Sequence, residues 1–147
     1  MTRQVSMVMA AAIALSVAGL AFAGTATAAV QHYSTRLAGG SEVPANDSKG
    51  VGKVEATLDT KTKAFSYSVT YSGLTGPATM AHFHGPAAPG ANAPPVIVVK
   101  NLASPMKGTA VLTDGQIADL QAGRWYFNIH TSAHPGGEIR GQLAPGK

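Results

Sequence analysis

Short segments of alternating polar and apolar residues, separated by glycine- and proline-rich breaks, limit this chain to an all-β fold. Residues 53–58 and 64–71 both show the two-residue period of a half-buried strand. The segment 59–62 between them has the composition of a turn, so the pair predicts a hairpin. The 147 residues include 17 glycines and 9 prolines, which supply the turns that closely spaced strands require.

The remaining segments extend the same pattern and add one helix. Further strands are expected at residues 32–37, 79–84, 108–112, 125–130 and 138–143. Residues 96–99 form a continuous β-branched run, which predicts a strand buried on both faces. A short helix is expected over 113–123, where Thr113 and Gln116 form a capping box and Gly123 ends the helix. We therefore predict an antiparallel Greek-key β-sandwich of about seven or eight strands with one short helix.

The first 28 residues have the layout of a secretory signal peptide. Arg3 gives a positive start, the following stretch is almost entirely apolar, and small-residue cleavage patterns come next. Cleavage is expected after Ala28, with Ala23 as the alternative site, and a membrane anchor is the competing interpretation. We predict a signal peptide at 1–28, one β-sandwich domain at 29–147, and a periplasmic or secreted protein that leaves the membrane once it is cleaved.

Composition narrows both the partners and the chemistry. Only 12% of the residues are charged, and the 11 lysines and arginines that give a net charge of +4 are scattered, which argues against nucleic-acid binding. The sequence has no P-loop, dinucleotide fingerprint or nucleophile elbow. It contains no cysteine, so disulfides and thiolate ligands are excluded. Imidazole and carboxylate groups are the metal ligands that remain.

Three histidines are the candidate metal ligands. His82 and His84 are two residues apart on a predicted strand, so their imidazoles share one face. His130 ends another predicted strand and adds a third imidazole if the two strands adjoin. Three imidazoles without a thiolate suit Cu(II), with Zn(II) the less favoured ion. An accidental or purely structural His-x-His pair is the competing interpretation, and the sequence leaves both open.

Three further residues are candidate accessory groups. Met80 shares the face of the histidine pair and is either a core residue or a soft axial ligand for copper. His134 precedes a proline in a turn and is either solvent-facing or a fourth ligand. Arg140 either forms an exposed ion pair with Glu138 on the same strand face or supplies a fixed charge that attracts small anions near His130.

Several motifs in a fixed order carry a family resemblance. They are LAGGSEVP at 37–44, HFHGPAAPG at 82–90, LTD at 112–114, GRWYFNIHT at 123–131 and PGGEIRGQL at 135–143. Together they resemble the CHRD (chordin-type) domain family and cover nearly all of the chain after the signal peptide. The resemblance implies an exported β-sandwich module, which in animals occurs within an extracellular signalling antagonist. It implies no settled activity.

A second, weaker resemblance is to the copper half of Cu/Zn superoxide dismutase. The order of a His-x-His pair, a long loop, a strand ending in His, a Gly-rich turn and an Arg is similar. It implies that His82, His84 and His130 match copper ligands and that Arg140 matches the substrate-guiding arginine. The chain departs from that pattern because it has no bridging histidine after His84, no zinc-ligand cluster and no disulfide.

The leading hypothesis is an exported CHRD-domain protein that binds a single copper ion, for copper binding, storage or handover. Its partner is then a metal ion rather than nucleic acid or a membrane. Two alternatives stay open: an extracellular structural or interaction module without metal, and a superoxide dismutase-like copper enzyme. The sequence indicates neither a protein partner nor an oligomeric state.

Overall fold

A computed structural model describes residues 29–146 of the chain, and the expected signal peptide at 1–28 lies outside the described residues. Within that range the fold is all-β, as predicted. The elements in chain order are β1 (Val30–Ala38), η1 (Gly39–Ser41), β2 (Val51–Asp59), β3 (Ala64–Ser72), β4 (Ala78–His84), β5 (Pro95–Val98), β6 (Met106–Val111), α1 (Asp114–Gln121), β7 (Tyr126–Thr131), β8 (Ile139–Gln142) and β9 (Ala144–Pro145).

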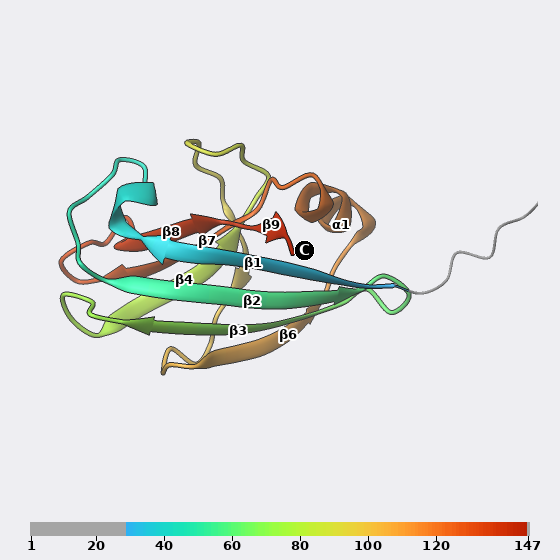
Figure 1. Ribbon diagram of the computed structural model, residues 1–147, viewed down its shortest axis with the longest axis horizontal. Coiled ribbons are helices and arrows are strands. Elements are labelled where there is room, and N and C mark those ends of the chain that lie inside the picture. Colours follow the sequence, from blue (N-terminus) through green and yellow to red (C-terminus); the bar gives the residue numbers. More distant parts are fainter. Residues whose placement is uncertain (1–28, 147) are drawn as a thin grey trace, which may run out of the picture.

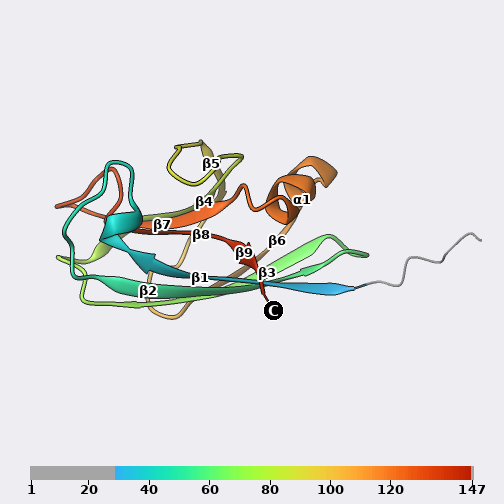
Figure 2. The same cartoon turned by 45° about the horizontal axis from the view of Figure 1, so that its top comes forward.

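The strands form one antiparallel sheet that folds over itself into two layers (Figures 1 and 2). The strand order is β5-β4-β7-β8-β1-β2-β3-β6, and the short β9 pairs with β1. The two layers join where β8 meets β1, through the single residue pair Ala38 and Arg140. Because β3 neighbours β6 and β4 neighbours β7, the chain crosses repeatedly between the layers, as Greek-key sandwiches do.

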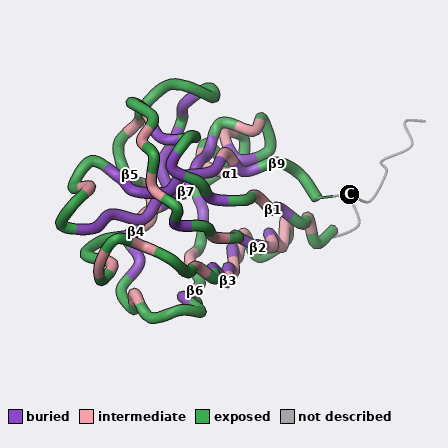
Figure 3. Tube along the Cα trace, turned by 60° about the vertical axis from the view of Figure 1, so that its left-hand side comes forward, coloured by how far each residue is buried: buried purple, intermediate pink, exposed green. Residues whose placement is uncertain are grey.

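Aromatic rings from both layers fill the core and fix the orientation of β4. The ring of Phe83 lies 5.3 Å from that of Phe65 in the opposite layer and 4.7 Å from that of Phe127 on the neighbouring strand, centroid to centroid. Ala81 and Phe83 are both fully buried. Because side chains alternate along a strand, the even-numbered residues of β4 must point to the outer face of this layer. The buried and exposed stretches of the trace appear in Figure 3.

The structure confirms the predicted helix and corrects the predicted burial of the segment at β5. The capping box of α1 is confirmed: Thr113 Oγ1 accepts from the Gln116 N–H at 3.2 Å, and Gln116 Oε1 accepts from the Thr113 N–H at 2.9 Å. No helix among the described residues has the length and apolar character to cross a membrane. The prediction that residues 96–99 are buried on both faces is wrong. Residues 96–98 belong to the edge strand β5, where Val98 is 61% exposed, and only Val99, which follows the strand, is buried. β-branched residues favour any strand and not only a central one.

Candidate metal centre

The three histidines lie together on the outer face of the β4–β7 pair. In the register of these strands, Met80 is opposite His130 and His82 is opposite Asn128. His82 and His84 point outward because Ala81 and Phe83 on either side of His82 point into the core. The two strands adjoin, which is the condition for His130 to lie beside the His82 and His84 pair. The core packing of β4 leaves its even-numbered residues no other orientation.

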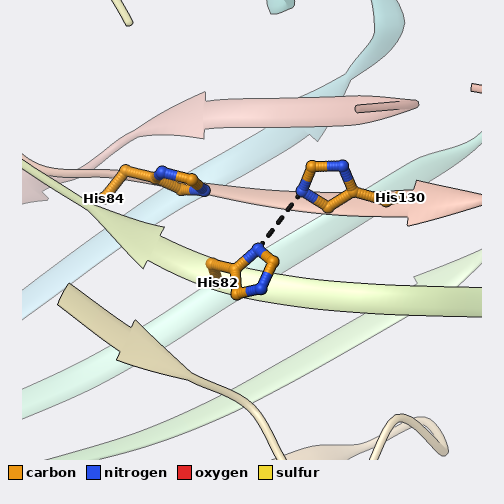
Figure 4. Close-up of side chains that lie close together, drawn as sticks. All are labelled: His82, His84 and His130. Atoms are coloured by element: carbon orange, nitrogen blue, oxygen red, sulfur yellow. Dashed lines mark hydrogen bonds between the residues drawn. The ribbon is translucent and has the colours of Figure 1, made fainter. Parts of the chain in front are cut away.

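The imidazole rings converge on one point. One ring nitrogen from each histidine lies within 4.8 Å of the others. His82 Nδ1 and His130 Nε2 are 3.3 Å apart, and the far end of the His84 ring points toward the same space (Figure 4). The centroid of the His82 ring lies 5.3 Å from that of the His84 ring and 5.1 Å from that of the His130 ring. Within the described residues this is the one cluster of three or more His, Asp or Glu side chains with such geometry.

Main-chain carbonyl groups determine which nitrogen each of two rings presents. His84 Nδ1 donates to the carbonyl oxygen of Ala93 at 2.8 Å, and His130 Nδ1 donates to that of Pro135 at 2.9 Å. A carbonyl only accepts, so each bond favours the neutral tautomer with its proton on Nδ1 and its lone pair on Nε2, while His84 Nε2 also faces a second acceptor, Asn128 Oδ1, at 3.0 Å. Carbonyl partners of this kind orient metal-binding imidazoles in many proteins.

The neutral, ligand form of two rings is favoured by their surroundings. Burial lowers the pKa of His82 below its ordinary value of 6.5, and the neighbouring His130 and His84 rings lower it further. Burial also lowers the pKa of His84, although its hydrogen bonds with Ala93 and Asn128 act in the opposite direction. Since only the neutral imidazole donates a lone pair to a metal, both shifts favour coordination.

The accessory candidates occupy different positions relative to the cluster. Met80 is 46% exposed and lies beside the cluster, opposite His130 in the strand register. His134 lies in the turn after β7 and is outside the group of three converging nitrogens. Arg140 is only 2% exposed. Its guanidinium donates to Asn92 Oδ1 at 2.8 Å, and its charge is therefore directed into the protein and not toward solvent above the cluster.

The exposed ion pair between Glu138 and Arg140, one of the two alternatives for Arg140, is absent among the described residues, and both side chains are buried. Glu138 instead accepts hydrogen bonds from Ser48 Oγ at 2.6 Å, Thr75 N at 2.8 Å, Thr75 Oγ1 at 2.7 Å and Thr131 Oγ1 at 2.5 Å. Burial would raise the pKa of Glu138, but these bonds outweigh it and lower the pKa to about 2.

Two residues near the site were missed by the sequence analysis. Asn128 is 3% exposed, and its side-chain amide lies 3.0 Å from His84 Nε2. Glu42 is buried against Asn128 where Gly137, with a φ of 132°, leaves no Cβ to displace it. Burial raises the pKa of Glu42 to about 7, against the opposing effects of the Arg140 charge and the Asn128 hydrogen bond. Strand alternation would have found Asn128, whereas nothing in the sequence pattern indicates Glu42.

The fold and the cluster define a class of protein: an antiparallel β-sandwich with three converging imidazoles on an outer sheet face. The family model of the CHRD domain matches residues 33–143, and the chain belongs to that family. CHRD domains occur in extracellular or secreted proteins. No curated protein and no solved structure matches the chain. The resemblance to the copper half of superoxide dismutase therefore stays a prediction.

Proposed function

We propose that this protein is exported, loses residues 1–28 as a signal peptide, and binds one copper ion through His82, His84 and His130. Its role is then copper binding, storage or handover outside the cytoplasm. The observation that carries the proposal is the convergence of three ring nitrogens within 4.8 Å of one another. Membership of a family whose members are extracellular or secreted supports the location.

The three ring nitrogens can bind a single ion if they move slightly closer together. Metal–imidazole bonds are about 2.0 Å long, so two nitrogens on one ion are at most about 4 Å apart. The 3.3 Å between His82 Nδ1 and His130 Nε2 already satisfies this limit. The widest pair of the cluster, within 4.8 Å, needs to approach by less than about 1 Å. Rotation of the half-buried His82 ring is the simplest way to supply that movement.

The contact between His82 and His130 also predicts a change of tautomer when a metal binds. His130 Nδ1 donates to Pro135, so its Nε2 accepts, and the 3.3 Å contact requires the proton to sit on His82 Nδ1. A metal that binds both nitrogens displaces this proton from Nδ1, and the neutral His82 ring then carries it on Nε2, so binding is coupled to a change of tautomer.

The ligand set favours copper over the other divalent ions. Nitrogen sites bind Cu²⁺ more tightly than Zn²⁺ and the other first-row ions, and the chain offers no cysteine thiolate that would favour zinc. Met80 is opposite His130 in the strand register, and its thioether is a soft group that suits copper rather than zinc. We therefore expect copper to displace zinc from the protein in a direct competition.

The test is a Cu(II) titration of the purified protein, followed by electron paramagnetic resonance. One equivalent of copper is expected to give a spectrum with nitrogen coupling. The double variant His82→Ala with His130→Ala is expected to lose this signal. His32→Ala is the matched control, because His32 is exposed on β1 in the opposite layer and close to the expected mature N-terminus, where copper binds adventitiously.

Two results would contradict the proposal. Binding that persists in the double variant means that the ion sits elsewhere, and binding lost in His32→Ala identifies a terminal site. If the wild-type protein takes up no copper and its melting temperature is unchanged by the metal, the alternative of an extracellular interaction module without metal is supported. The buried position of Arg140 gives no support to a superoxide-guiding role.

A further inference from the structure

The loop at residues 85–95 is held over the outer face of β4, β7 and β8, beside His84 (Figure 2). Gln142 on β8 donates to the carbonyl oxygen of Ala87 at 2.9 Å. His84 itself donates to Ala93 near the other end of the loop. The loop is therefore part of the surroundings of the histidine cluster and not a free surface segment.

The carbonyl of Ala93 selects the nitrogen that His84 presents. With the proton on Nδ1, the lone pair on Nε2 points toward the other two rings. Nε2 also lies 3.0 Å from Asn128 Oδ1, a second acceptor that competes with the Ala93 carbonyl for the ring proton. If Ala93 moved away, the proton would be free to sit on Nε2 and block the lone pair.

Tyr126 supports both Ala93 and His84. The Tyr126 hydroxyl donates to the Ala93 carbonyl oxygen at 3.2 Å and accepts from the Ala93 N–H at 3.2 Å. The rings of Tyr126 and His84 are stacked, with centroids 4.6 Å apart and an interplanar angle of 3°. Tyr126 is 2% exposed, so the stack is protected from water and holds the plane of the His84 ring.

Arg140 supports the same loop from the other side of β7. Its guanidinium carbon lies 3.4 Å from the centroid of the Tyr126 ring, in a cation–π contact. The guanidinium donates to Ala91 O at 2.6 Å and to Asn92 Oδ1 at 2.8 Å, the two residues that precede Ala93. A rigid, planar guanidinium can make these bonds and stack at the same time, whereas a lysine cannot.

We propose that Arg140 and Tyr126 are positioning residues for His84: they fix the 91–93 segment so that Ala93 keeps the His84 proton on Nδ1 and leaves Nε2 to the metal. The inference rests on the proposed function for its consequence in copper binding. In this proposal the buried charge of Arg140 serves to orient His84 and does not attract an anion.

The experiment has two readouts and three variants. The first readout is the tautomer of the His84 ring, measured by ¹⁵N NMR in the metal-free protein at pH 8, which requires no copper. The second is Cu(II) affinity, measured by competition with a chelator. Tyr126→Phe removes the hydroxyl and keeps the ring stack, while Arg140→Lys keeps the charge and loses the planar fork. Tyr71→Phe is the control, since it removes a hydroxyl that donates to Leu102 O at 2.7 Å, away from the cluster.

In the wild-type protein and in Tyr71→Phe, His84 is expected to carry its proton on Nδ1. Tyr126→Phe and Arg140→Lys are expected to shift the proton toward Nε2 and to weaken copper binding about 10- to 100-fold, the usual effect of losing an outer partner of a ligand. Folded variants that keep the wild-type tautomer and affinity would overturn the inference. If the wild-type protein binds no copper, the proposed function fails, while the tautomer still decides the role of Arg140 and Tyr126.

Discussion

Replacing Glu138 with glutamine is expected to lower the free energy of unfolding by about 2–4 kcal/mol at neutral pH. Glu138 is fully buried, and its carboxylate accepts four hydrogen bonds from three separate parts of the chain. Ser48 precedes β2, Thr75 lies between β3 and β4, and Thr131 ends β7. The carboxylate therefore ties the two layers together close to the turn whose Pro135 carbonyl orients His130.

The magnitude follows from the change of charge at an unchanged volume. A hydrogen bond to a charged group contributes about 1.5–3 kcal/mol and a neutral one about 0.5–1.5 kcal/mol, so each of the four bonds weakens by about 1 kcal/mol. The amide nitrogen of glutamine can face the Thr75 and Thr131 hydroxyls, which rotate to accept. Removing a buried charge offsets part of the loss, which gives the lower end of the range.

The same group predicts a pH dependence. The pKa of Glu138 is lowered to about 2 in the folded protein, against an ordinary value of 4.5. Its contribution to stability is therefore complete above about pH 4.5 and is lost as the pH falls toward about 2. The difference in unfolding free energy between the wild type and Glu138→Gln should be largest above pH 5 and should narrow below it.

Urea unfolding at several pH values measures both effects. Glu55→Gln is the matched control, because the Glu55 side chain is 66% exposed and pairs only with the exposed Lys53. Its expected change is within about 0.5 kcal/mol. A loss for Glu138→Gln no larger than that of the control, or a loss that does not change with pH, would refute the reasoning about the buried network.

Two further predictions concern Glu42 and the close approach of β8 to β1. Burial raises the pKa of Glu42 to about 7, so stability should fall as the pH rises from about 4.5 to 7. When urea unfolding is measured across this range, the unfolding free energy of Glu42→Gln should fall less steeply with pH than that of the wild type. An equally steep fall would contradict the raised pKa of Glu42. A Cβ at Gly141 would overlap the main-chain oxygen of Arg36, whereas one at Gly76 meets nothing within 4 Å. Gly141→Ala should therefore lose about 1–3 kcal/mol more than Gly76→Ala in thermal unfolding, and equal losses would exclude a tight contact.

Strand alternation was enough to predict the fold class and half of the site. Because the period of a strand is two, His82 and His84 had to share a face, and the hairpin of β2 and β3 was visible in the same way. The helix was predicted from its capping box, a local signal, and both hydrogen bonds of that box are present in the structure. These features depend on residues close together in the sequence, where pattern and structure are directly related.

The rest of the site depends on contacts between distant segments. That β4 pairs with β7 follows from the packing of Phe83 and Phe127, which residue spacing does not encode. The burial of Arg140 depends on how the 85–95 loop folds over the sheet. The proline-rich sequence of the loop does not indicate which face of the sheet it covers. An exposed pair was one alternative for Glu138 because charged residues are usually exposed, whereas its hydroxyl partners come from three other segments.

The most direct test of the metal site is a crystal structure of the copper-loaded protein with diffraction data collected on both sides of the copper absorption edge. We predict one anomalous peak between the three rings, within about 2–2.3 Å of His82 Nδ1, His84 Nε2 and His130 Nε2. A peak at His32 or at the N-terminus, or fully loaded crystals with no peak between the three rings, would contradict the proposed function.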